Sequence, residues 1–142
     1  MPAPDEATLE VVREWLDKAE NDLTAAGQIL KLGKGAPTDT ICFHAQQCVE
    51  KYLKAILVHE GTPVPKTHNI QALMKLVPRG RRAGLTAEEQ KQFTNYAAVI
   101  RYPEAGLEIS LAEARKAMAV ARRVSRQIRR FLPKAVLRRR KR

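Results

Sequence analysis

The sequence lacks an apolar run of the roughly 18 to 20 residues that a membrane-spanning helix needs. No signal peptide is expected either, because residues 1–10 are acidic and contain no basic stretch followed by an apolar one. With 44% hydrophobic and 29% charged residues, the composition is typical of a soluble globular protein. We therefore expect the 142 residues to form one cytoplasmic domain that does not bind membranes.

Cysteine and histidine are scarce, with two Cys and three His in the chain. Cys42 and Cys48 lie six positions apart in one predicted helix, a spacing that suits neither a disulfide nor a CxxC metal motif. The His residues are scattered and have no acidic cluster nearby, so we expect no metal site. Phosphate-binding patterns such as GxxxxGKS or GxGxxG are absent, and we expect no cofactor. Both Cys are expected to be reduced residues of the core.

Strand patterns are also missing, because the few β-branched residues do not alternate with polar ones over four or more positions. Apolar residues recur instead at helical spacing, and Gly or Pro residues separate the periodic segments. The sequence predicts an all-α fold, an up-and-down bundle of about five helices. The predicted helices are residues 7–32, 38–60, 68–77, 87–100 and 110–132.

Polar residues are placed to begin several of these helices. Thr38 or Asp39 can cap the second helix, and Thr67 is the expected N-cap of the third. Thr86 is followed three positions later by Glu89, which is the pattern of a capping box for the fourth helix.

Acidic residues are absent from residues 122–142, which hold 11 Lys or Arg. Residues 1–121 hold 15 basic and 15 acidic residues, so the whole net charge of +11 comes from the C-terminal end. Pro133 is expected to end the last helix, because proline lacks the amide hydrogen that the helix needs. We therefore divide the chain into a helical domain, 1–133, and a basic tail, 134–142.

Arginine dominates this basic end. Arg122, Arg126 and Arg129 recur at helical spacing and predict a cationic ridge, and Arg123 with Arg130 predicts a second one. Guanidinium groups grip phosphate oxygens in pairs, so we expect the basic end to bind a nucleic-acid backbone without reading bases. A docking arm for an acidic protein and a solvated tail without a role are the alternatives. The candidate tail residues are Arg138, Arg139, Arg140, Lys141 and Arg142.

One face of the second predicted helix carries His44, Gln47, Lys51 and Lys54 within an arc of roughly 80°. His and Gln both donate and accept hydrogen bonds, which suits a half-buried site. Apolar residues flank this face, so we expect the helix to be covered on both sides by another helix, a protomer or a ligand. A solvated face is the alternative, and Lys54 with Glu50 forms an i,i+4 pair that requires no function.

Four stretches of the sequence resemble the minimal prokaryotic HEPN family (higher eukaryotes and prokaryotes nucleotide-binding domain). The family pattern is a Gln-Gln-x-x-Glu-Lys helix, a Thr-His turn and an Arg-Tyr-Pro loop on an all-α bundle. The likeness extends over about residues 10–130. Its stretches are KAENDLTAAGQIL (18–30), FHAQQCVEKYLKAIL (43–57), KTHNIQALMKL (66–76) and RYP (101–103).

The resemblance implies a homodimer formed through the long helices. It further implies a pairing with a small nucleotidyltransferase in a toxin–antitoxin-like module, and the binding of a nucleotide or RNA. The main expectation is thus a binding module without catalysis or with weak activity. The residues expected to bind the nucleotide or phosphate are His44, Gln47, Lys51, Lys54, Arg101 and Tyr102.

Some branches of this family are metal-independent RNases in which an Arg is followed, after four to six residues, by a His. Arg101 is the natural candidate for that Arg, but positions 106–108 hold Gly, Leu and Glu. An RNase would need His68, or His44, to reach Arg101 in space, with the His as base and the Arg as cation. His68 and Arg101 can equally serve structure alone. A divergent RNase and a non-catalytic protein-interaction scaffold are therefore the alternatives.

Overall fold

The computed structural model describes residues 3–99 and 108–138, and this part of the chain contains helices but no strand. The predicted all-α fold is confirmed. Five helices of seven or more residues form the body, and a 3-10 turn and one short helix complete it. The elements are α1 (Glu6–Leu30), α2 (Thr38–His59), α3 (Ile70–Leu76), η1 (Arg79–Arg81), α4 (Ala87–Val99), α5 (Leu111–Arg129) and α6 (Lys134–Leu137).

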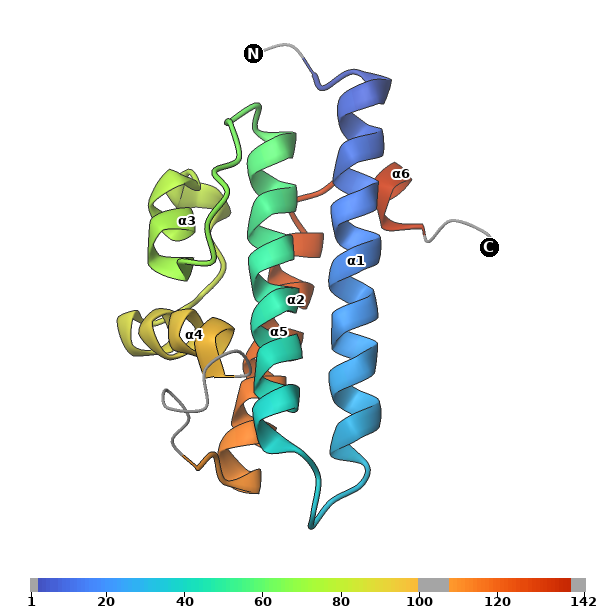
Figure 1. Ribbon diagram of the computed structural model, residues 1–142. Helices are drawn as coiled ribbons and strands as arrows, with labels where there is room; N and C mark the ends of the chain where they lie inside the picture. Colours follow the sequence, from blue (N-terminus) through green and yellow to red (C-terminus); the bar gives the residue numbers. More distant parts are fainter. Residues whose placement is uncertain (1–2, 100–107, 139–142) are drawn as a thin grey trace.

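The long helix α2 is the centre of the bundle (Figure 1). Helix α1 runs beside it along its whole length, and α5 lies behind it. Helices α3 and α4 contact α2 on the side away from α1, while α6 lies against α1. Because four helices contact α2, only Phe43, His44, Gln47 and Lys51 stay partly exposed between Ile41 and Leu57. The expectation that this helix is covered on both sides is confirmed.

Helix α1 buries one apolar seam against α2. Val12, Leu16, Ala19 and Ala26 recur every three to seven residues along this seam and are buried. Asp22 occupies the same seam and is also buried, with 9% of its surface exposed. A carboxylate in that position needs partners inside the protein, because water reaches it poorly.

A buried hydroxyl joins three helices at the core. Tyr52 of α2 donates to the carboxylate of Glu20 on α1, and Ser125 of α5 donates to the Tyr52 oxygen at 2.9 Å. The Arg129 guanidinium donates to the same oxygen at 3.4 Å. Burial, and then the neighbouring Glu20, raise the pKa of Tyr52, so the phenol stays protonated. These bonds explain why Ser125 lies among the otherwise apolar buried residues of α5.

Helix starts agree only in part with the sequence. The capping box is confirmed, since the Glu89 amide donates to Thr86 Oγ1 at 3.0 Å and the Thr86 amide to Glu89 Oε1 at 2.9 Å. The prediction of Thr67 as N-cap of α3 is wrong. Asn69 is the cap and accepts from the Ala72 amide at 2.9 Å. Thr67 accepts from the Asn69 amide instead, so the cap lies two residues later than predicted.

The predicted cap of α2 is also wrong. Pro37 is the N-cap residue and makes no side-chain hydrogen bond. The Thr38 hydroxyl donates to the Ile109 carbonyl at 2.6 Å, and the Asp39 carboxylate accepts from the neighbouring Thr40 amide at 2.8 Å. A long-range partner and a local turn therefore engage both side chains that could have capped the helix.

The chain continues beyond Pro133 into α6, a short helix that the sequence did not predict. Val136 is buried, and Arg13 of α1 donates to the Ala135 carbonyl at 2.9 Å. Part of the segment assigned to the basic tail thus contacts the bundle, whereas the domain boundary at 133 stays a prediction. Arg138 is exposed. The tail candidates Arg139, Arg140, Lys141 and Arg142 lie outside the described residues.

Both cysteines are free and buried, as predicted. Burial raises the pKa of Cys42 to about 12 and raises that of Cys48 well above its ordinary value. Both thiols therefore stay protonated and act as small apolar core residues. In the described ranges, no helix has the length and apolar character required to cross a membrane.

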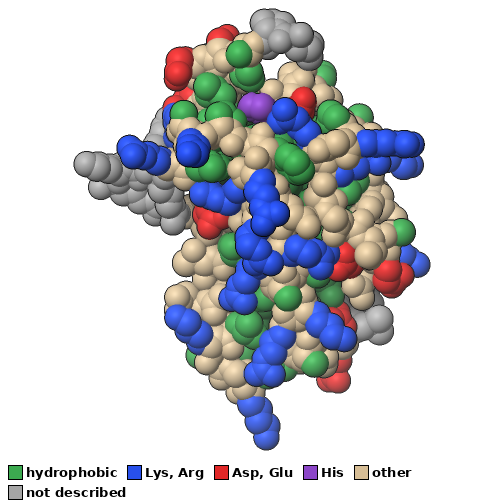
Figure 2. All heavy atoms as spheres, turned by 180° about the vertical axis from the view of Figure 1, so that it is seen from behind, with side chains coloured by type: hydrophobic (Ala, Val, Ile, Leu, Met, Phe, Trp, Pro, Cys, Tyr) green, Lys and Arg blue, Asp and Glu red, His purple; other side chains and the backbone are tan. Residues whose placement is uncertain are grey.

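The basic residues of α5 differ from the two predicted ridges. Arg123 bonds Glu89 of α4 at 2.7 Å, and Arg129 lies 3.8 Å from Glu20 of α1. Both arginines turn toward acidic residues of neighbouring helices, which the spacing along one helix does not predict. Lys and Arg side chains gather on the face of the molecule seen in Figure 2. The exposed arginines of this segment are Arg115, Arg122, Arg126 and Arg130.

Replacing Thr86 by Ala removes half of the capping box, and we expect the free energy of unfolding to fall by about 1 kcal/mol. Thr24 is exposed in the middle of α1, where Ala is the better helix former, so Thr24→Ala should leave stability unchanged or slightly higher. Urea unfolding followed by circular dichroism measures both variants. An equal loss in the two variants contradicts the capping role of Thr86.

Candidate functional site

Asp22 of α1 holds two basic side chains of α2 where the two helices meet. Its Oδ1 lies 2.9 Å from His44 Nδ1, and its Oδ2 accepts from Lys51 Nζ at 2.5 Å. His44 and Lys51 lie two helical turns apart on α2, with Gln47 between them, so all three project from one face. This arrangement confirms that the predicted residues His44, Gln47 and Lys51 lie on one face, with Asp22 of α1 opposite.

A second group of polar residues surrounds Glu50, which is 3% exposed. Its carboxylate accepts from Gln46 Nε2 at 2.9 Å and from Lys54 Nζ at 3.0 Å, and it lies 2.8 Å from His68 Nδ1. The Lys54 ammonium also lies 5.5 Å from the centre of the Trp15 ring on α1. Lys54 is thus buried and neutralised inside the protein, and it does not stand on the open face with Lys51.

One hydrogen bond ties Gln47, which lies between His44 and Lys51 on α2, to the second group. Gln47 Nε2 donates to Gln46 Oε1 at 2.7 Å, and Gln46 in turn donates to Glu50. The polar cluster, which we define as Asp22, His44, Gln46, Gln47, Glu50, Lys51, Lys54 and His68, therefore draws on α1, α2 and the loop before α3. A network of this kind fixes side-chain orientation, because moving one member leaves another without its partner.

The hydrogen bonds around Glu50 decide its protonation. Burial by itself would raise the pKa of this carboxyl group. Donation from Gln46, His68 and Lys54 outweighs the burial, and the pKa of Glu50 lies below its ordinary value. Glu50 is therefore ionised at neutral pH and forms a buried ion pair with Lys54.

Both histidines of the cluster meet a carboxylate through Nδ1. An ionised carboxylate only accepts hydrogen bonds, so Nδ1 of each ring is the donor, and Nε2 is the acceptor of the neutral ring. The side chain of His44 is 28% exposed and that of His68 47% exposed. Each ring is thus held from inside while part of it remains accessible from outside. Such a ring can accept a proton or, once protonated, donate to an anion.

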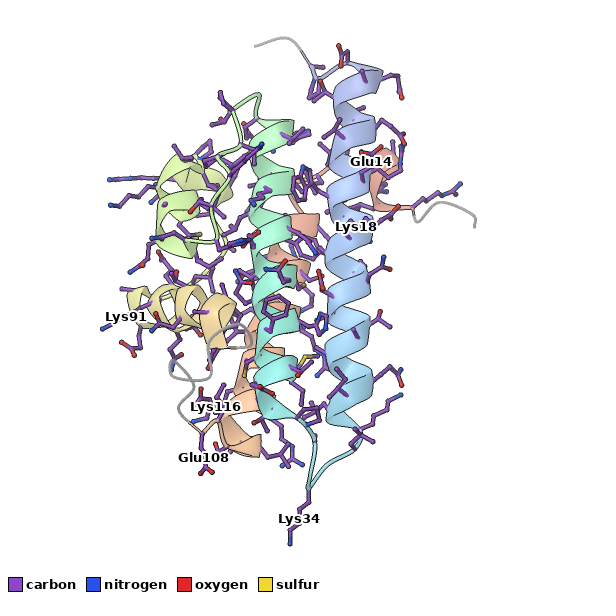
Figure 3. All side chains as sticks on the ribbon, viewed as in Figure 1. Glu14, Lys18, Lys34, Lys91, Glu108 and Lys116 are labelled. Atoms are coloured by element: carbon purple, nitrogen blue, oxygen red, sulfur yellow. The ribbon has the colours of Figure 1, made fainter. Side chains whose placement is uncertain are left out.

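Isolated surface cations differ from these residues. Lys18, Lys34 and Lys91 point away from the bundle into solvent (Figure 3), and within the described ranges none of them forms an ion pair. Lys51 is only partly exposed and is fixed by Asp22. The Lys51 ammonium therefore loses less freedom when it meets a ligand than a free surface lysine would.

Two of the predicted residues cannot be placed in this cluster. Arg101 and Tyr102 lie outside the described residues. The sequence interpretation named Glu50 only as a partner of Lys54 and did not name Gln46 as a site residue. The signal for both was present, because Gln46, Glu50 and Lys54 follow one another at i,i+4 spacing. What the spacing could not reveal is that this line of residues faces the interior.

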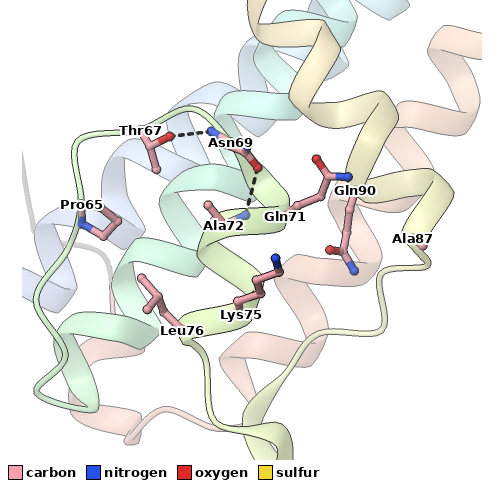
Figure 4. Close-up of a pocket in the computed structure, with 9 residues that line it drawn as sticks. All are labelled: Pro65, Thr67, Asn69, Gln71, Ala72, Lys75, Leu76, Ala87 and Gln90. Carbon is pink, nitrogen blue, oxygen red and sulfur yellow. Dashed lines mark hydrogen bonds between the residues drawn. The ribbon is translucent and has the colours of Figure 1, made fainter.

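A groove near His68 lies between α3 and α4 and has a volume of about 840 Å³ (Figure 4). Thr67 and Asn69, the neighbours of His68 in sequence, belong to its lining. Gln71 and Gln90 supply amide groups, although Gln90 already donates to the Leu85 carbonyl at 3.0 Å. Among residues 3–99 and 108–138, no group of three or more His, Cys, Asp or Glu is placed to hold a metal ion.

Comparisons with known proteins bear on the whole domain. A family model described as the HEPN domain matches residues 12–131, a range that contains the entire polar cluster. The crystal structure of TT1696 from Thermus thermophilus superposes on this chain with a TM-score of 0.70 and 27% sequence identity. The alignment covers 85% of this chain and 98% of that chain. The curated proteins give no significant match.

Glu50→Gln leaves the buried Lys54 ammonium without a counter-charge, and we expect the free energy of unfolding to fall by roughly 3 to 5 kcal/mol. The double variant Glu50→Gln/Lys54→Met removes both charges and should recover most of that loss. Urea unfolding at pH 7 measures the three proteins. A double variant as unstable as Glu50→Gln contradicts the ion pair as the reason for the loss.

The same carboxyl group gives stability a dependence on pH. Because the pKa of Glu50 is lowered on folding, its contribution is fully present above the unfolded value of about 4.5 and is lost as the pH falls through the folded value. Between pH 7 and pH 3 the natural protein should therefore lose more stability than the double variant. Parallel pH profiles of the two proteins contradict the lowered pKa.

Proposed function

This chain belongs to the HEPN domain family, a group of nucleotide- and RNA-related helical modules, and we propose that it binds phosphate groups of a nucleotide or of RNA beside Asp22, where α1 and α2 meet. We call this place the Asp22 site. His44, Gln47 and Lys51 are the proposed contacts. The observation that carries the proposal is the fixation of His44 and Lys51 by a single buried carboxylate, Asp22. Arg101 and Tyr102 remain proposed contacts from the family resemblance.

The chemistry of these groups suits a phosphate. Lys51 has three ammonium hydrogens and donates to Asp22 Oδ2, so further hydrogens are available to a ligand. Protonated His44 adds a second charged donor through Nε2. Charge-assisted bonds from donors that are already oriented bind phosphate well, since little side-chain entropy is lost. Lys54 and Glu50 have a different proposed role, which is to hold His68 in place.

A divergent, metal-independent RNase is the second candidate, and one observation favours it. Each of His44 and His68 is oriented by a carboxylate through Nδ1, the arrangement by which acids orient catalytic histidines. A base of this kind could take the proton of a 2′-hydroxyl, while Lys51 or Arg101 steadied the phosphate. The linear Arg-x4-6-His motif is missing, so this activity depends on which residues meet in space.

The family resemblance supports two proposals about partners. The first is a homodimer through the long helices. The second is a small nucleotidyltransferase that forms a toxin–antitoxin-like pair with this chain. A protein-interaction scaffold is the alternative without a nucleotide. Sedimentation velocity of the chain alone, and mixed with such a nucleotidyltransferase, measures both associations.

Lys51→Met should weaken the binding of ATP and of a labelled single-stranded RNA by about tenfold or more, the worth of a charge-assisted hydrogen bond of about 1.5–3 kcal/mol. Lys18→Met is the matched control, because Lys18 is exposed on α1 and points into solvent. Fluorescence anisotropy and calorimetry in chelator measure the affinities, with circular dichroism as the check of folding. Unchanged affinity in Lys51→Met rules out phosphate binding at the Asp22 site.

The same RNA, separated on a gel, distinguishes the two candidates. Cleavage in chelator that is lost in both His44→Ala and Lys51→Met, but kept in Lys18→Met, supports the RNase. Binding without cleavage supports the non-catalytic module. If neither RNA nor ATP binds, the phosphate proposal fails and the scaffold takes its place.

A further inference from the structure

Helix α5 and its C-cap carry a line of exposed arginines, and Lys and Arg side chains gather on the face of the molecule seen in Figure 2. Arg115, Arg122, Arg126 and Arg130 are all exposed and follow one another at spacings of seven, four and four residues. This spacing keeps them on one side of the helix, and we call them the arginine stripe. With a rise of about 1.5 Å per residue, the stripe extends over roughly 22 Å.

The arginine stripe has no acidic partners among the described residues. Other arginines of the bundle do have them, since Arg13 bonds Glu10, Arg81 bonds Glu60 and Arg123 bonds Glu89. Within residues 3–99 and 108–138, no carboxylate lies within salt-bridge distance of any member of the stripe. Like charges at i,i+4 destabilise a helix, although the helix dipole favours the two arginines at the C-terminal end of α5, Arg126 and Arg130.

We propose that the arginine stripe binds the sugar–phosphate backbone of RNA, on a surface separate from the Asp22 site. The guanidinium fork matches two phosphate oxygens at once, which a lysine cannot do. Four guanidinium groups spread over this length can each meet a different phosphate of the same RNA. The inference rests on the proposed function in one respect, namely that the ligand is a nucleic acid.

An acidic protein fits this surface less well. Stable protein interfaces need a central cluster of aromatic or large apolar side chains that leave water. The exposed positions between the arginines are Lys116 and Ala119, and neither offers a large apolar side chain. The stripe also offers no aromatic ring on which a base could stack, which predicts binding without sequence preference. The side chains therefore provide charge and hydrogen bonds but no apolar anchor.

The test compares two full-length variants with the same loss of charge. The first is R115Q/R122Q/R126Q/R130Q, in which Gln preserves helix propensity. The second is K66Q/K75Q/R79Q/K91Q, which removes exposed cations from the side of the molecule that carries α3 and α4. Anisotropy of labelled single-stranded and duplex RNA of arbitrary sequence gives Kd at a series of salt concentrations. A polyglutamate peptide serves as the acidic-protein probe.

The stripe variant should lose affinity at least tenfold at low salt. Each neutralised phosphate contributes about 0.7 to the log–log salt slope for a single strand and about 0.9 for a duplex, so the slope should become shallower by about 2 to 3.5. The variant on the α3–α4 side should keep its slope to within about 1. The RNA form that loses more affinity in the stripe variant is the one that the stripe prefers.

Two results overturn the stripe. One is an equal change in both variants, which indicates a general effect of net charge. The other is polyglutamate binding as tight as RNA binding and equally dependent on the stripe, which indicates an acidic protein partner. The Asp22 site is tested independently, because Lys51→Met measures ATP binding, and ATP is too short to extend along the stripe. Loss of RNA binding in the stripe variant with intact ATP binding supports both proposals.

Discussion

A carboxylate buried in a helical bundle must find its hydrogen-bond donors inside the protein, and Glu50 has three of them. Gln46, Lys54 and His68 all reach its two oxygens. Because these donors come from α2 and from the loop before α3, the same bonds fix the loop against the central helix. Asp22 does the same on the other side, where it joins α1 to His44 and Lys51. The polar cluster thus contributes to the packing of the helices and to the orientation of the exposed groups together.

The distribution of charge separates two surfaces. In the polar cluster, Asp22 and Glu50 each form an ion pair with one lysine. Binding at the Asp22 site therefore depends on the orientation of the side chains more than on net charge. On α5 the arginines lack such partners among the described residues, so binding there depends on long-range attraction and on salt. A module with both surfaces could hold RNA by its backbone on α5 while the Asp22 site recognises a single phosphate. The net charge of +11 in the chain is consistent with this division.

Much of the fold follows from the sequence, because helix period, Gly and Pro breaks and the Thr86–Glu89 box are local signals. The polar face of α2 was equally visible, since three of its residues lie on one side at helical spacing. Partners across helices were not visible. Nothing local shows that Thr38 bonds Ile109, or that Arg129 turns toward Glu20 and leaves the predicted ridge. The burial of Lys54 likewise depends on Trp15, a residue 39 positions earlier in the chain.

Side-chain nitrogen NMR spectra, recorded while ATP is added in chelator, report directly on the Asp22 site. If His44 and Lys51 hold a phosphate, the signals of His44 Nε2 and Lys51 Nζ shift with ATP concentration, while those of His59, which lies near the C-terminal end of α2, stay in place. Shifts confined to the groove between α3 and α4, or no shifts at all, contradict a phosphate site built on Asp22.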